Sequence, residues 1–453
     1  MKILIAGGGK IGSCLTEQLT NEGHELTVID CSTAVLEDMM EKYDVITVAG
    51  NAASMSVLET AGVKDAELFI AATDMDEVNM LACMTAHGMN PNLTTIGRIR
   101  NPEYRIQAYE MRDVFGLTMA VNPEKQAAHE IARLLNFPGF LSVDSFAKGN
   151  VEIVELKIDA KNPLNGTKLS KMSDIVHTQV LVCAVQRNGQ TIMPDGNFVI
   201  RENDQLFFTA TPANLTQMLK NIGIIAKKAK RVLIAGGGRI SYYLVKELEK
   251  SGMDCTIMES DEERCHELAD ILPECTVIHG DASSQEFLDM EGVGDSDAVV
   301  TLTGLDELNI VISLYANTRN VSQVVTKLSH AENNKILDSL PIGAVISPKE
   351  LAGYSILRYV RAMQNQEGSA VSVHRIAGGK IDALEFKVDK ETKHRGEPLR
   401  NVKTKSNVLI ASIFSHGKVD IPSGNSRFNE GDTVIVVTTA DAPIYNLNDI
   451  FED

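Results

Sequence analysis

The chain has 453 residues, enough for three or four compact domains, and a formal net charge of −18 spread along its length. Because a nucleic-acid binder needs a basic face, this acidity argues against nucleic acid as a partner. No uninterrupted apolar segment reaches the ~18 to 20 residues of a membrane helix, and the first residues form a strand pattern rather than a signal peptide. The seven cysteines lack C-x-x-C pairs and zinc-like spacing, so we expect free thiols in a reducing cytosol and no metal site.

The first ~120 residues alternate short β-branched runs with segments that carry apolar residues at helical spacing. The expected strands are Lys2–Ala6, Glu25–Ile29, Asp44–Val48, Glu67–Ala72, Thr94–Ile99 and Leu117–Val121. Alternation of buried strands with helices predicts an α/β fold, a Rossmann-like doubly wound parallel sheet.

The same pattern returns after about 229 residues. The phrase "ILIAGGGKIG" at 3–12 is echoed by "VLIAGGGRIS" at 232–241, and "AATDMDEVNM" at 71–80 is echoed by "LTGLDELNIV" at 302–311. A repeat of this length indicates duplicated domains rather than a solenoid. The sequence therefore predicts two Rossmann-like domains.

A shorter, strand-rich segment follows each Rossmann-like pattern. In the first, "VQRNGQTI" places Asn188 and Gly189 between two apolar runs, which is typical of a β-hairpin. Glycine- or proline-containing joints at 136–140 and 365–369 separate these small α+β modules from the domains before them. The predicted order is a Rossmann-like domain at 1–136, a small module at 140–224, a Rossmann-like domain at 230–364 and a small module at 369–453.

The loop between the first strand and helix has the spacing Gly7-x-Gly9-x-x-Gly12. The first glycine permits the tight turn, the second lets the backbone approach a pyrophosphate, and the third lets helix and strand pack closely. The phosphates would meet the N–H groups of a helix that starts near Lys10. Asp30, 18 residues after Gly12, is placed to hold both ribose hydroxyls, which favours NAD(H) over NADP(H).

The second copy departs from this pattern at Ser241, where the third glycine would stand, but keeps an acid at Glu259. "HGDAS" at 279–283 corresponds to "AGNAA" at 49–53, after the third strand, where an adenine ring would lie. The second loop is therefore either a second nucleotide site, whose ligand need not be the same, or a vestigial one.

Polar residues follow the fourth and fifth strands. Thr73 or Asp74 is expected to cap the next helix, and both also fit as lining of a nucleotide cleft at the carboxyl ends of the strands. Arg98 and Arg100 would clamp a phosphate or form surface salt bridges, and the second copy has Lys327 instead.

No histidine forms an obvious couple with Lys, Ser or Cys, so no catalytic residue is assigned. Cys31 adjoins Asp30 and is expected to be a buried small residue rather than a redox-sensitive thiol. Two other functions compete with a nucleotide sensor: an NAD-dependent dehydrogenase with a duplicated cofactor domain, and a ligand-gated transcription regulator, which lacks a helix-turn-helix segment here.

The doubled glycine loop, strand-end acid, "TDMDEVN" and "RIRNPEY", each copy followed by a small module, resembles the TrkA family over the whole chain. These are the cytosolic regulatory subunits of Trk potassium-uptake systems, built of tandem RCK (KTN) domains. The resemblance implies a ring-like homotetramer, peripheral at the inner face of the cell membrane. It would dock on a potassium-conducting, TrkH/TrkG-like subunit and control its gating according to bound NAD(H), with ATP and ADP as further ligands.

The resemblance also implies which residues hold the nucleotide. In the first copy they are Gly7, Gly8, Gly9, Lys10, Ile11, Gly12, Asp30, Asn51, Ala52, Thr73, Asp74 and Arg98. In the second copy they are Gly236, Gly237, Gly238, Arg239, Ile240, Glu259, Asp281, Thr303 and Lys327. The family uses the helices expected at Pro123–Asn136 and Pro348–Gln364 as crossover and dimer elements.

Overall fold

The computed structural model describes residues 1–137, 139–224, 229–329, 337, 340–363, 370–376, 380–439 and 444–452. They form two compact units, Met1–Ala128 with Ser347–Tyr359, and His129–Ile346 with Val360–Asp453. Pro138 of the first expected joint, the whole of the second joint and Gln364 lie outside the described residues. Every helix among the described residues is too short or too polar to cross a membrane.

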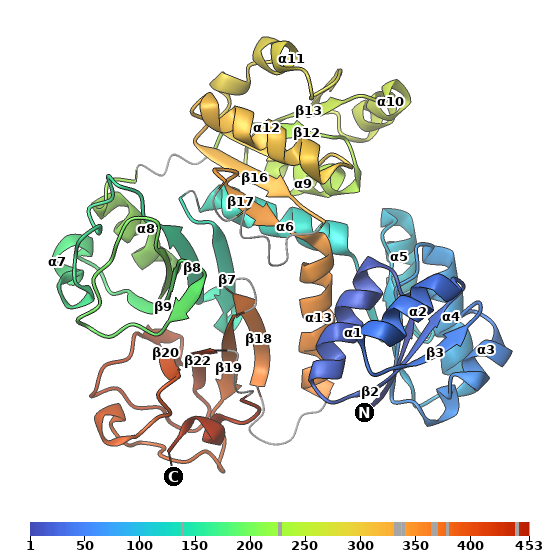
Figure 1. Cartoon of the computed structure of the whole chain (residues 1–453), viewed down its shortest axis with the longest axis horizontal. Helices are drawn as coiled ribbons and strands as arrows, with labels where there is room; N and C mark the ends of the chain where they lie inside the picture. The colour runs from blue at the N-terminus through green and yellow to red at the C-terminus, as the bar shows by residue number, and fades with distance from the viewer. Residues whose placement is uncertain are drawn as a thin grey trace. The chain divides into compact units, whose positions relative to one another are not determined.

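The first unit is built on a six-stranded parallel sheet with the order β3-β2-β1-β4-β5-β6. Its strands are β1 (Lys2–Ala6), β2 (Glu25–Asp30), β3 (Ile46–Ala49), β4 (Leu68–Ala71), β5 (Thr94–Arg98) and β6 (Met119–Val121). This is the strand order of a dinucleotide-binding fold, and the predicted α/β class is confirmed (Figure 1).

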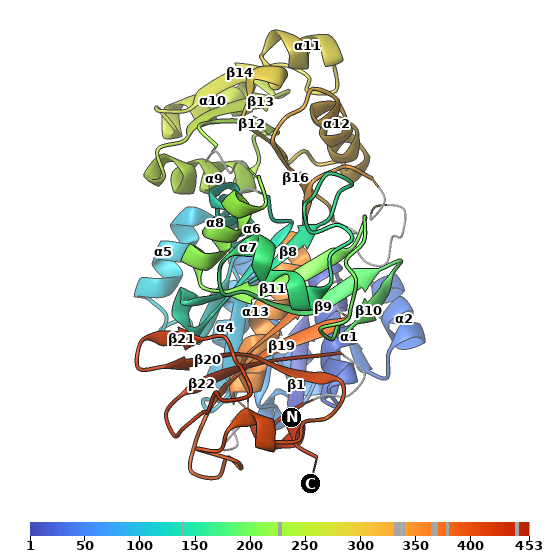
Figure 2. The same ribbon diagram turned by 90° about the vertical axis from the view of Figure 1, so that its left-hand side faces the viewer.

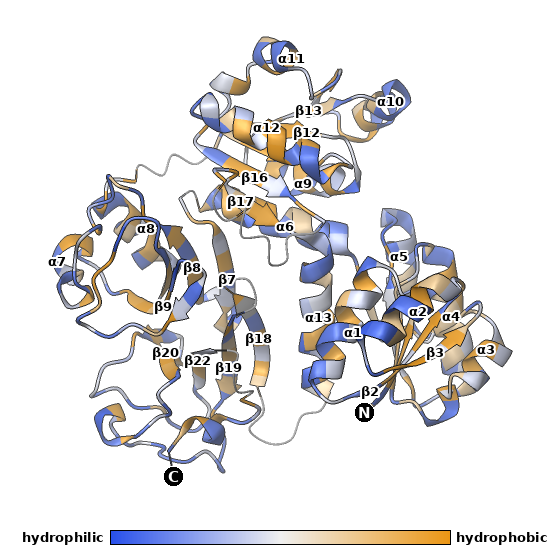
Figure 3. Cartoon of the chain, in the orientation of Figure 1, coloured by the Kyte–Doolittle hydropathy of each residue, from blue (hydrophilic) through white to orange (hydrophobic). Residues whose placement is uncertain are grey.

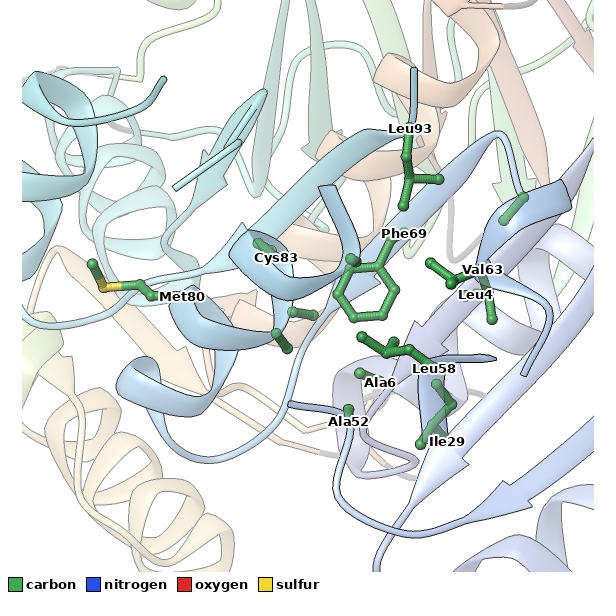
Figure 4. Packing of buried hydrophobic residues seen from close by; sticks show 14 of the residues in the cluster. Leu4, Ala6, Ile29, Ala52, Leu58, Val63, Phe69, Met80, Cys83 and Leu93 are labelled. Atoms are coloured by element: carbon green, nitrogen blue, oxygen red, sulfur yellow. The ribbon is translucent and has the colours of Figure 1, made fainter. Parts of the chain in front are cut away.

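Helices connect these strands and cover both faces of the sheet. They are α1 (Lys10–Asn21), α2 (Thr33–Lys42), α3 (Met55–Thr60), α4 (Asp76–Met89) and α5 (Pro102–Glu110). The ring of Phe69 on β4 is buried on one face of the sheet in a cluster with Leu4 and Leu58 (Figure 4). Burial of such side chains holds helices and strands together, at roughly 25 cal/mol per Å² of apolar surface.

Some predicted strand ends are wrong by one or two residues. The third strand begins at Ile46 rather than Asp44, because a solvated aspartate is poorly suited to a strand. The sixth begins at Met119 rather than Leu117, and the second extends by one residue to include Asp30. Inclusion of Asp30 in the strand fixes its side chain at the carboxyl edge of the sheet.

The second unit contains a parallel sheet that repeats the first, with the order β14-β13-β12-β15-β16-β17 among the described residues. Its strands are β12 (Arg231–Ala235), β13 (Asp254–Glu259), β14 (Thr276–His279), β15 (Ala298–Thr301), β16 (Gln323–Lys327) and β17 (Ala344–Ile346). Its helices are α9 (Arg239–Lys250), α10 (Glu262–Ile271), α11 (Gln285–Met290) and α12 (Asp306–Thr318). Figure 3 shows the apolar strand β12 beside helices with mixed surfaces.

Each small module is an antiparallel sheet, β10-β9-β11-β8-β7 in the first and β18-β19-β22-β20-β21 in the second (Figure 2). The first contains β7 (Ser142–Phe146), β8 (Val151–Lys157), β9 (Leu181–Arg187), β10 (Gln190–Ile192), β11 (Gln205–Ala210), α7 (Ser173–Val176) and α8 (Pro212–Asn221). The second contains β18 (Ala370–Ile376), β19 (Ile381–Lys387), β20 (Val408–Ser415), β21 (Lys418–Asp420) and β22 (Thr433–Thr439). The predicted hairpin is confirmed, because Asn188 and Gly189 link β9 to β10 with φ of 53° and 75°.

Within the second unit the two small modules share one hydrophobic core. Phe146 and Phe207 of the first module belong to the same buried cluster as Ile381 and Ile435 of the second. A polar contact joins the same surfaces, because His374 Nδ1 lies 2.8 Å from Asp144 Oδ1. The two modules therefore form a continuous body within this unit.

The last helix of each repeat packs on a parallel sheet domain. In the first unit, Gly353 of α13 (Pro348–Met363) lies against Cys14 and Gln18 of α1, where a Cβ on Gly353 would be 3.3 Å from Cys14 Sγ. In the second unit, the side chain of Gln323 on β16 donates to the carbonyl of Leu134 on α6 (Pro123–Asn136) at 3.3 Å. Residues 348–359 of α13, in the second repeat, thus belong to the unit that holds the first glycine loop.

Candidate functional site

The first glycine loop joins β1 to α1 as a tight turn. Gly7 has φ of +97°, and a Cβ there would lie 2.9 Å from the carbonyl oxygen of Ala72 on the neighbouring strand end. A Cβ on Gly12 would overlap the carbonyl oxygen of Gly7, so only glycine lets α1 approach this closely. Gly9 caps α1 without a side-chain hydrogen bond, which leaves the first helical N–H groups available to an anion.

Asp30 is held at the end of β2 beside this loop. Its Oδ2 accepts the N–H of Gly8 at 2.7 Å, and its Oδ1 accepts the N–H of Ser32 at 2.8 Å. An ionised carboxylate has about four lone-pair sites, so Asp30 can accept two more hydrogen bonds. That capacity matches the two hydroxyls of a ribose.

The carboxyl ends of β4 and β5 are tied together by Asn79, a residue that sequence reasoning missed. Its buried side chain accepts the N–H of Thr73 at 2.9 Å and its hydroxyl at 2.7 Å. It also donates to the carbonyls of Thr73 and Arg98 at 3.2 and 2.9 Å. The expectation that Thr73 or Asp74 caps α4 is wrong: the N-cap is Met75, because Thr73 is engaged by Asn79.

The two arginines after β5 have different surroundings. Arg100 pairs with Asp76 at 3.3 Å, and Asp76 also accepts the backbone N–H groups of Arg100 and Asn101, so backbone hydrogen bonds reinforce this salt bridge. Arg98 lies 3.4 Å from Asp74 and 3.8 Å from Glu124. Burial, with help from neighbouring Arg100, lowers the pKa of the Arg98 guanidinium.

Arg98 Nε is buried without a hydrogen-bond partner among the described residues. A phosphate oxygen placed there would satisfy this donor, so the phosphate-clamp interpretation suits Arg98 better than Arg100.

The loop after β3 contains the residues that the sequence predicts on the adenine side. Asn51 is exposed and its Oδ1 accepts the N–H of Ala53 at 3.0 Å, while Ala52 is buried beneath it. Lys10 is exposed at the start of α1, and Ile11 is buried in the core. The expectation of a buried Cys31 is wrong: this thiol is exposed on the rim, because the chain leaves the sheet immediately after Asp30.

The second glycine loop reproduces the turn with one adjustment. Gly236 has φ of +104°, and a Cβ there would lie 2.9 Å from the backbone of Leu302. Ser241 replaces the third glycine, and its hydroxyl donates to the carbonyl of Gly236 at 2.5 Å. Gly238 caps α9 without a side-chain bond, Arg239 is exposed and Ile240 is buried.

Glu259 ends β13 as Asp30 ends β2, and its Oε2 accepts the N–H of Gly237 at 2.6 Å. Burial works to raise the pKa of Glu259, but N–H donors from Asp261, Gly237 and Ser260 outweigh it and lower the pKa. Asp281 is exposed, and its hydrogen bonds from Ser283 lower its pKa.

The ends of β15 and β16 repeat the asparagine link. Asn309 accepts the N–H of Thr303 at 2.9 Å and donates to the carbonyl of Lys327 at 3.0 Å. Lys327 Nζ donates to the carbonyl of Thr303 at 2.5 Å. The recurrence of "TDMDEVN" and "TGLDELN" contained this signal, because Asn79 and Asn309 stand at matched positions in both.

In each copy, the structure places the predicted site residues along the carboxyl edge of one parallel sheet. The glycine loop and the strand-end acid are in direct contact, and so are the residues after the fourth and fifth strands. Within the described ranges, no group of three or more His, Cys, Asp or Glu side chains is arranged to hold a metal ion. The residues present fit a nucleotide: two glycine turns that a Cβ would fill, free helix N–H groups and adjacent carboxylates.

The fold and these loops define a class of protein with two dinucleotide-type domains, each followed by an antiparallel module. Two family models match this arrangement, the TrkA-N domain at residues 3–123 and 232–348 and the TrkA-C domain at residues 153–223 and 383–447. The chain belongs to the TrkA family.

Curated relatives match over their full length. The Trk system potassium uptake protein TrkA of Halomonas elongata is 30% identical over 100% of this chain and 99% of the relative. The protein of the same name from Vibrio alginolyticus is 29% identical over 96% of this chain and 95% of the relative.

Solved structures share the fold at lower identity. The GsuK RCK domain superposes with a TM-score of 0.60 and 19% identity, covering 97% of this chain and 92% of that one. The GsuK channel bound to NAD superposes with a TM-score of 0.59 and 18% identity, covering 97% and 77%.

Proposed function

We propose that this chain is the nucleotide-sensing regulatory subunit of a Trk-type potassium uptake system. It binds NAD(H), with ADP and ATP as further ligands, and controls potassium flux through a membrane partner. The observation that carries the proposal is the hydrogen bond from Gly8 to Asp30 beside a helix terminus without a side-chain cap. That geometry occurs in a member of a family whose curated relatives are named as potassium uptake proteins.

The nucleotide would lie along the carboxyl edge of each parallel sheet. In the first copy, Gly7 to Gly12 would face the pyrophosphate, Asp30 the ribose, Asn51 and Ala52 the adenine, and Thr73, Asp74 and Arg98 the distal half. In the second copy the corresponding residues are Gly236 to Ile240, Glu259, Asp281, Thr303 and Lys327. The functional domains would be 1–136, 140–224, 230–364 and 369–453.

The chain would act by binding rather than by turnover. Hydride transfer needs a proton-transfer group and a substrate site beside the nicotinamide. The polar groups described beside the proposed distal half, Thr73, Asp74, Asn79 and Arg98, instead bond to one another or to backbone. Sensing then depends on a difference in nucleotide affinity between two conformations, which is what allows a ligand to shift an equilibrium.

A homo-oligomer, a tetramer as in the family resemblance, would dock at the cytoplasmic face of a potassium-conducting, TrkH/TrkG-like subunit. Exposed apolar side chains on α4, on α5 and directly after α5 support self-association, because exposed apolar surface marks interaction sites. We call this set the α4–α5 patch; it comprises Leu81, Met84, Ile106, Tyr109, Met111 and Val114. Membrane association would occur through the partner alone.

The test is a calorimetric titration of the full chain with NADH, NAD, ADP and ATP, together with NADH absorbance over hours in the presence of oxoacids. We expect binding without consumption, and co-purification with the potassium-conducting subunit. Steady oxidation of NADH would instead support the dehydrogenase alternative.

One variant tests the first loop. Asp30→Arg should weaken NADH binding at least tenfold, because a carboxylate that accepts ribose hydroxyls becomes a cation. Glu37→Arg, on the exposed face of α2, is the matched charge control and should leave affinity unchanged. Unchanged affinity in Asp30→Arg would mean that the loop is structural only.

A further inference from the structure

The two glycine loops differ in the number of hydrogen bonds that the strand-end carboxylate already accepts. Asp30 accepts one backbone N–H on each oxygen, from Gly8 and Ser32. Glu259 accepts four donors: the N–H of Gly237 on Oε2, and on Oε1 the N–H and hydroxyl of Ser260 and the N–H of Asp261. Each carboxylate oxygen has about two lone-pair sites. Asp30 therefore keeps one site on each oxygen for the two hydroxyls of a ribose, whereas Oε1 of Glu259 is fully used and only one site remains on Oε2.

The cause is the extra methylene of glutamate. It carries the carboxylate of Glu259 far enough past the end of β13 for Oε1 to accept the N–H groups of Ser260 and Asp261 at 2.7 and 2.9 Å. The shorter Asp30 reaches only the second N–H after itself, at Ser32. The extra carbon thus commits Oε1 of Glu259 to hydrogen bonds within its own loop.

The second loop also has a cation beside it that the first loop lacks. Arg264, in the first turn of α10, donates Nε to the carbonyl of Gly237 at 2.9 Å and Nη1 to Glu267 at 2.7 Å. Its side chain is 29% exposed, so the guanidinium is held at the rim of the loop.

The matching residue in the first copy is Val35, because the N-caps of the two helices, Ser32 and Asp261, accept from Val35 and Arg264 in the same way. Val35 Cγ1 lies 2.5 Å from where a Cβ on Gly8 would stand. The second loop keeps an apolar contact, from Leu268 to Gly237, and gains a positive charge at the position of Val35.

After the fifth strand, on the other side of the cleft, the second copy has fewer cations than the first among the described residues. The first copy has Arg98 and Arg100 after β5, and the second has Lys327 and Ser329, of which Lys327 bonds to the carbonyl of Thr303. Positive charge in the second copy has moved toward the side that holds the first half of a dinucleotide.

We propose that the second loop binds a nucleoside di- or triphosphate, recognised through its phosphates by Arg264, while the first loop binds NAD(H) through Asp30. A planar guanidinium forms paired hydrogen bonds to phosphate oxygens and needs no free ribose acceptor beside it. Arg264 Nη1 would release the exposed carboxylate of Glu267 and donate to a phosphate oxygen instead. The proposal rests on the nucleotide-binding function proposed above.

The experiment is a titration of ADP into the full chain saturated with NADH, by isothermal calorimetry. We expect one NADH per chain in the first step and one ADP per chain in the second. Arg264→Val should weaken the ADP step at least tenfold and leave the NADH step unchanged, and Arg264→Lys should retain part of the ADP affinity. Asp30→Asn should weaken NADH alone.

Glu259→Gln and Arg264→Val show whether the proposal for each loop holds. Glu259→Gln should leave NADH binding unchanged, because the proposal places NADH at the first loop; two NADH per wild-type chain, with one lost in Glu259→Gln, would overturn the proposal. ADP binding that is absent from the wild-type chain, or equal in wild type and Arg264→Val, would also overturn it. Failure of every nucleotide to bind the wild-type chain would instead refute the proposed function. If Arg264→Val has a lower melting temperature than the wild-type chain, Arg264→Gln is used in its place.

Discussion

At the scale of single residues, the two copies use different solutions to the same turn. In the first, Gly12 leaves no space between α1 and the carbonyl of Gly7. In the second, Ser241 stands at the matched position, and its hydroxyl bonds to the carbonyl of Gly236. The second turn therefore accommodates a side chain that the first cannot.

This difference predicts that a substitution at either position destabilises its turn, by overpacking in the first copy and by loss of a hydrogen bond in the second. Gly12→Ala should destabilise the first sheet domain by about 1–3 kcal/mol, the usual cost of overpacking, and should lower NADH affinity by displacing the loop. Ser241→Gly should cost about 1 kcal/mol, since it removes one hydrogen bond and adds backbone freedom. Thermal melts of both variants provide the measurement. Equal melting temperatures for Gly12→Ala and the wild type would contradict the close contact.

At the scale of elements, one buried asparagine fastens two strand ends in each copy. Asn79 is fully buried and bonds to Thr73 and to the carbonyl of Arg98, so it joins the ends of β4 and β5. Asn309 makes the same bonds between β15 and β16. These links hold the residues that we propose to face the distal half of the nucleotide.

Removal of the link should be costly in both stability and binding. Asn79→Leu keeps the volume but leaves the N–H of Thr73 and the carbonyl of Arg98 buried and unsatisfied, at about 1–3 kcal/mol each. We expect a lower melting temperature and weaker NADH binding. Asn221→Leu, on α8 of the small module, serves as the control, because Asn221 also bonds to a backbone carbonyl but lies outside the cleft. Intact NADH affinity in Asn79→Leu would exclude this role.

A second element-scale feature is a cluster of acids that share one guanidinium. Arg133 on α6 lies 3.0 Å from Glu130 and 3.2 Å from Glu152 on β8. Burial, opposed by Arg133 and reinforced by Asp144 and Glu152, raises the pKa of Glu130 to about 7. Burial likewise raises the pKa of Glu152. One arginine cannot neutralise both carboxylates, so the folded chain retains a proton here near neutrality.

This proton makes stability depend on pH. A carboxyl group whose pKa is higher in the folded chain than in the unfolded chain stabilises the fold below the unfolded value, and this contribution is lost as pH rises through the folded value. For Glu130 the loss should occur between pH ~4.5 and ~7. Glu130→Gln should flatten the decline in melting temperature over this range, whereas Glu37→Gln on exposed α2 should not. Parallel curves for wild type and Glu130→Gln would contradict the shared-proton interpretation.

At the scale of the whole molecule, duplication made the fold predictable, because two independent occurrences of strand, glycine turn, helix and acid reinforce one another. The sheet class, the start of α1 near Lys10 and the Asn188–Gly189 hairpin followed from local periodicity and turn chemistry. Contacts between distant segments did not: the bond from Asn79 to Arg98 and the bond from Gly237 to Glu259 depend on where the chain returns in space. The exposure of Cys31 was missed because the expectation followed the general tendency of free cysteines to be buried, whereas this thiol lies in the loop after β2.

Assembly is also a property of the whole molecule, and the α4–α5 patch provides its test. Its six side chains are between 43% and 76% exposed, and α4 and α5 are adjacent, since Tyr104 of α5 hydrogen-bonds to Glu77 of α4. If copies of the chain cover this patch, Leu81→Asp with Ile106→Asp places charges in an apolar interface and should dissociate the oligomer.

Size-exclusion chromatography with light scattering measures the result. The wild-type chain should have about four times its mass of 49.3 kDa, and the double variant a smaller multiple. Met290→Asp is the matched control, because Met290 is 72% exposed on α11 and lies outside the patch. An unchanged mass for the double variant would place the assembly surface elsewhere. A folded variant that still binds NADH would show that each first loop binds nucleotide without its neighbours, as expected from a site built within one unit.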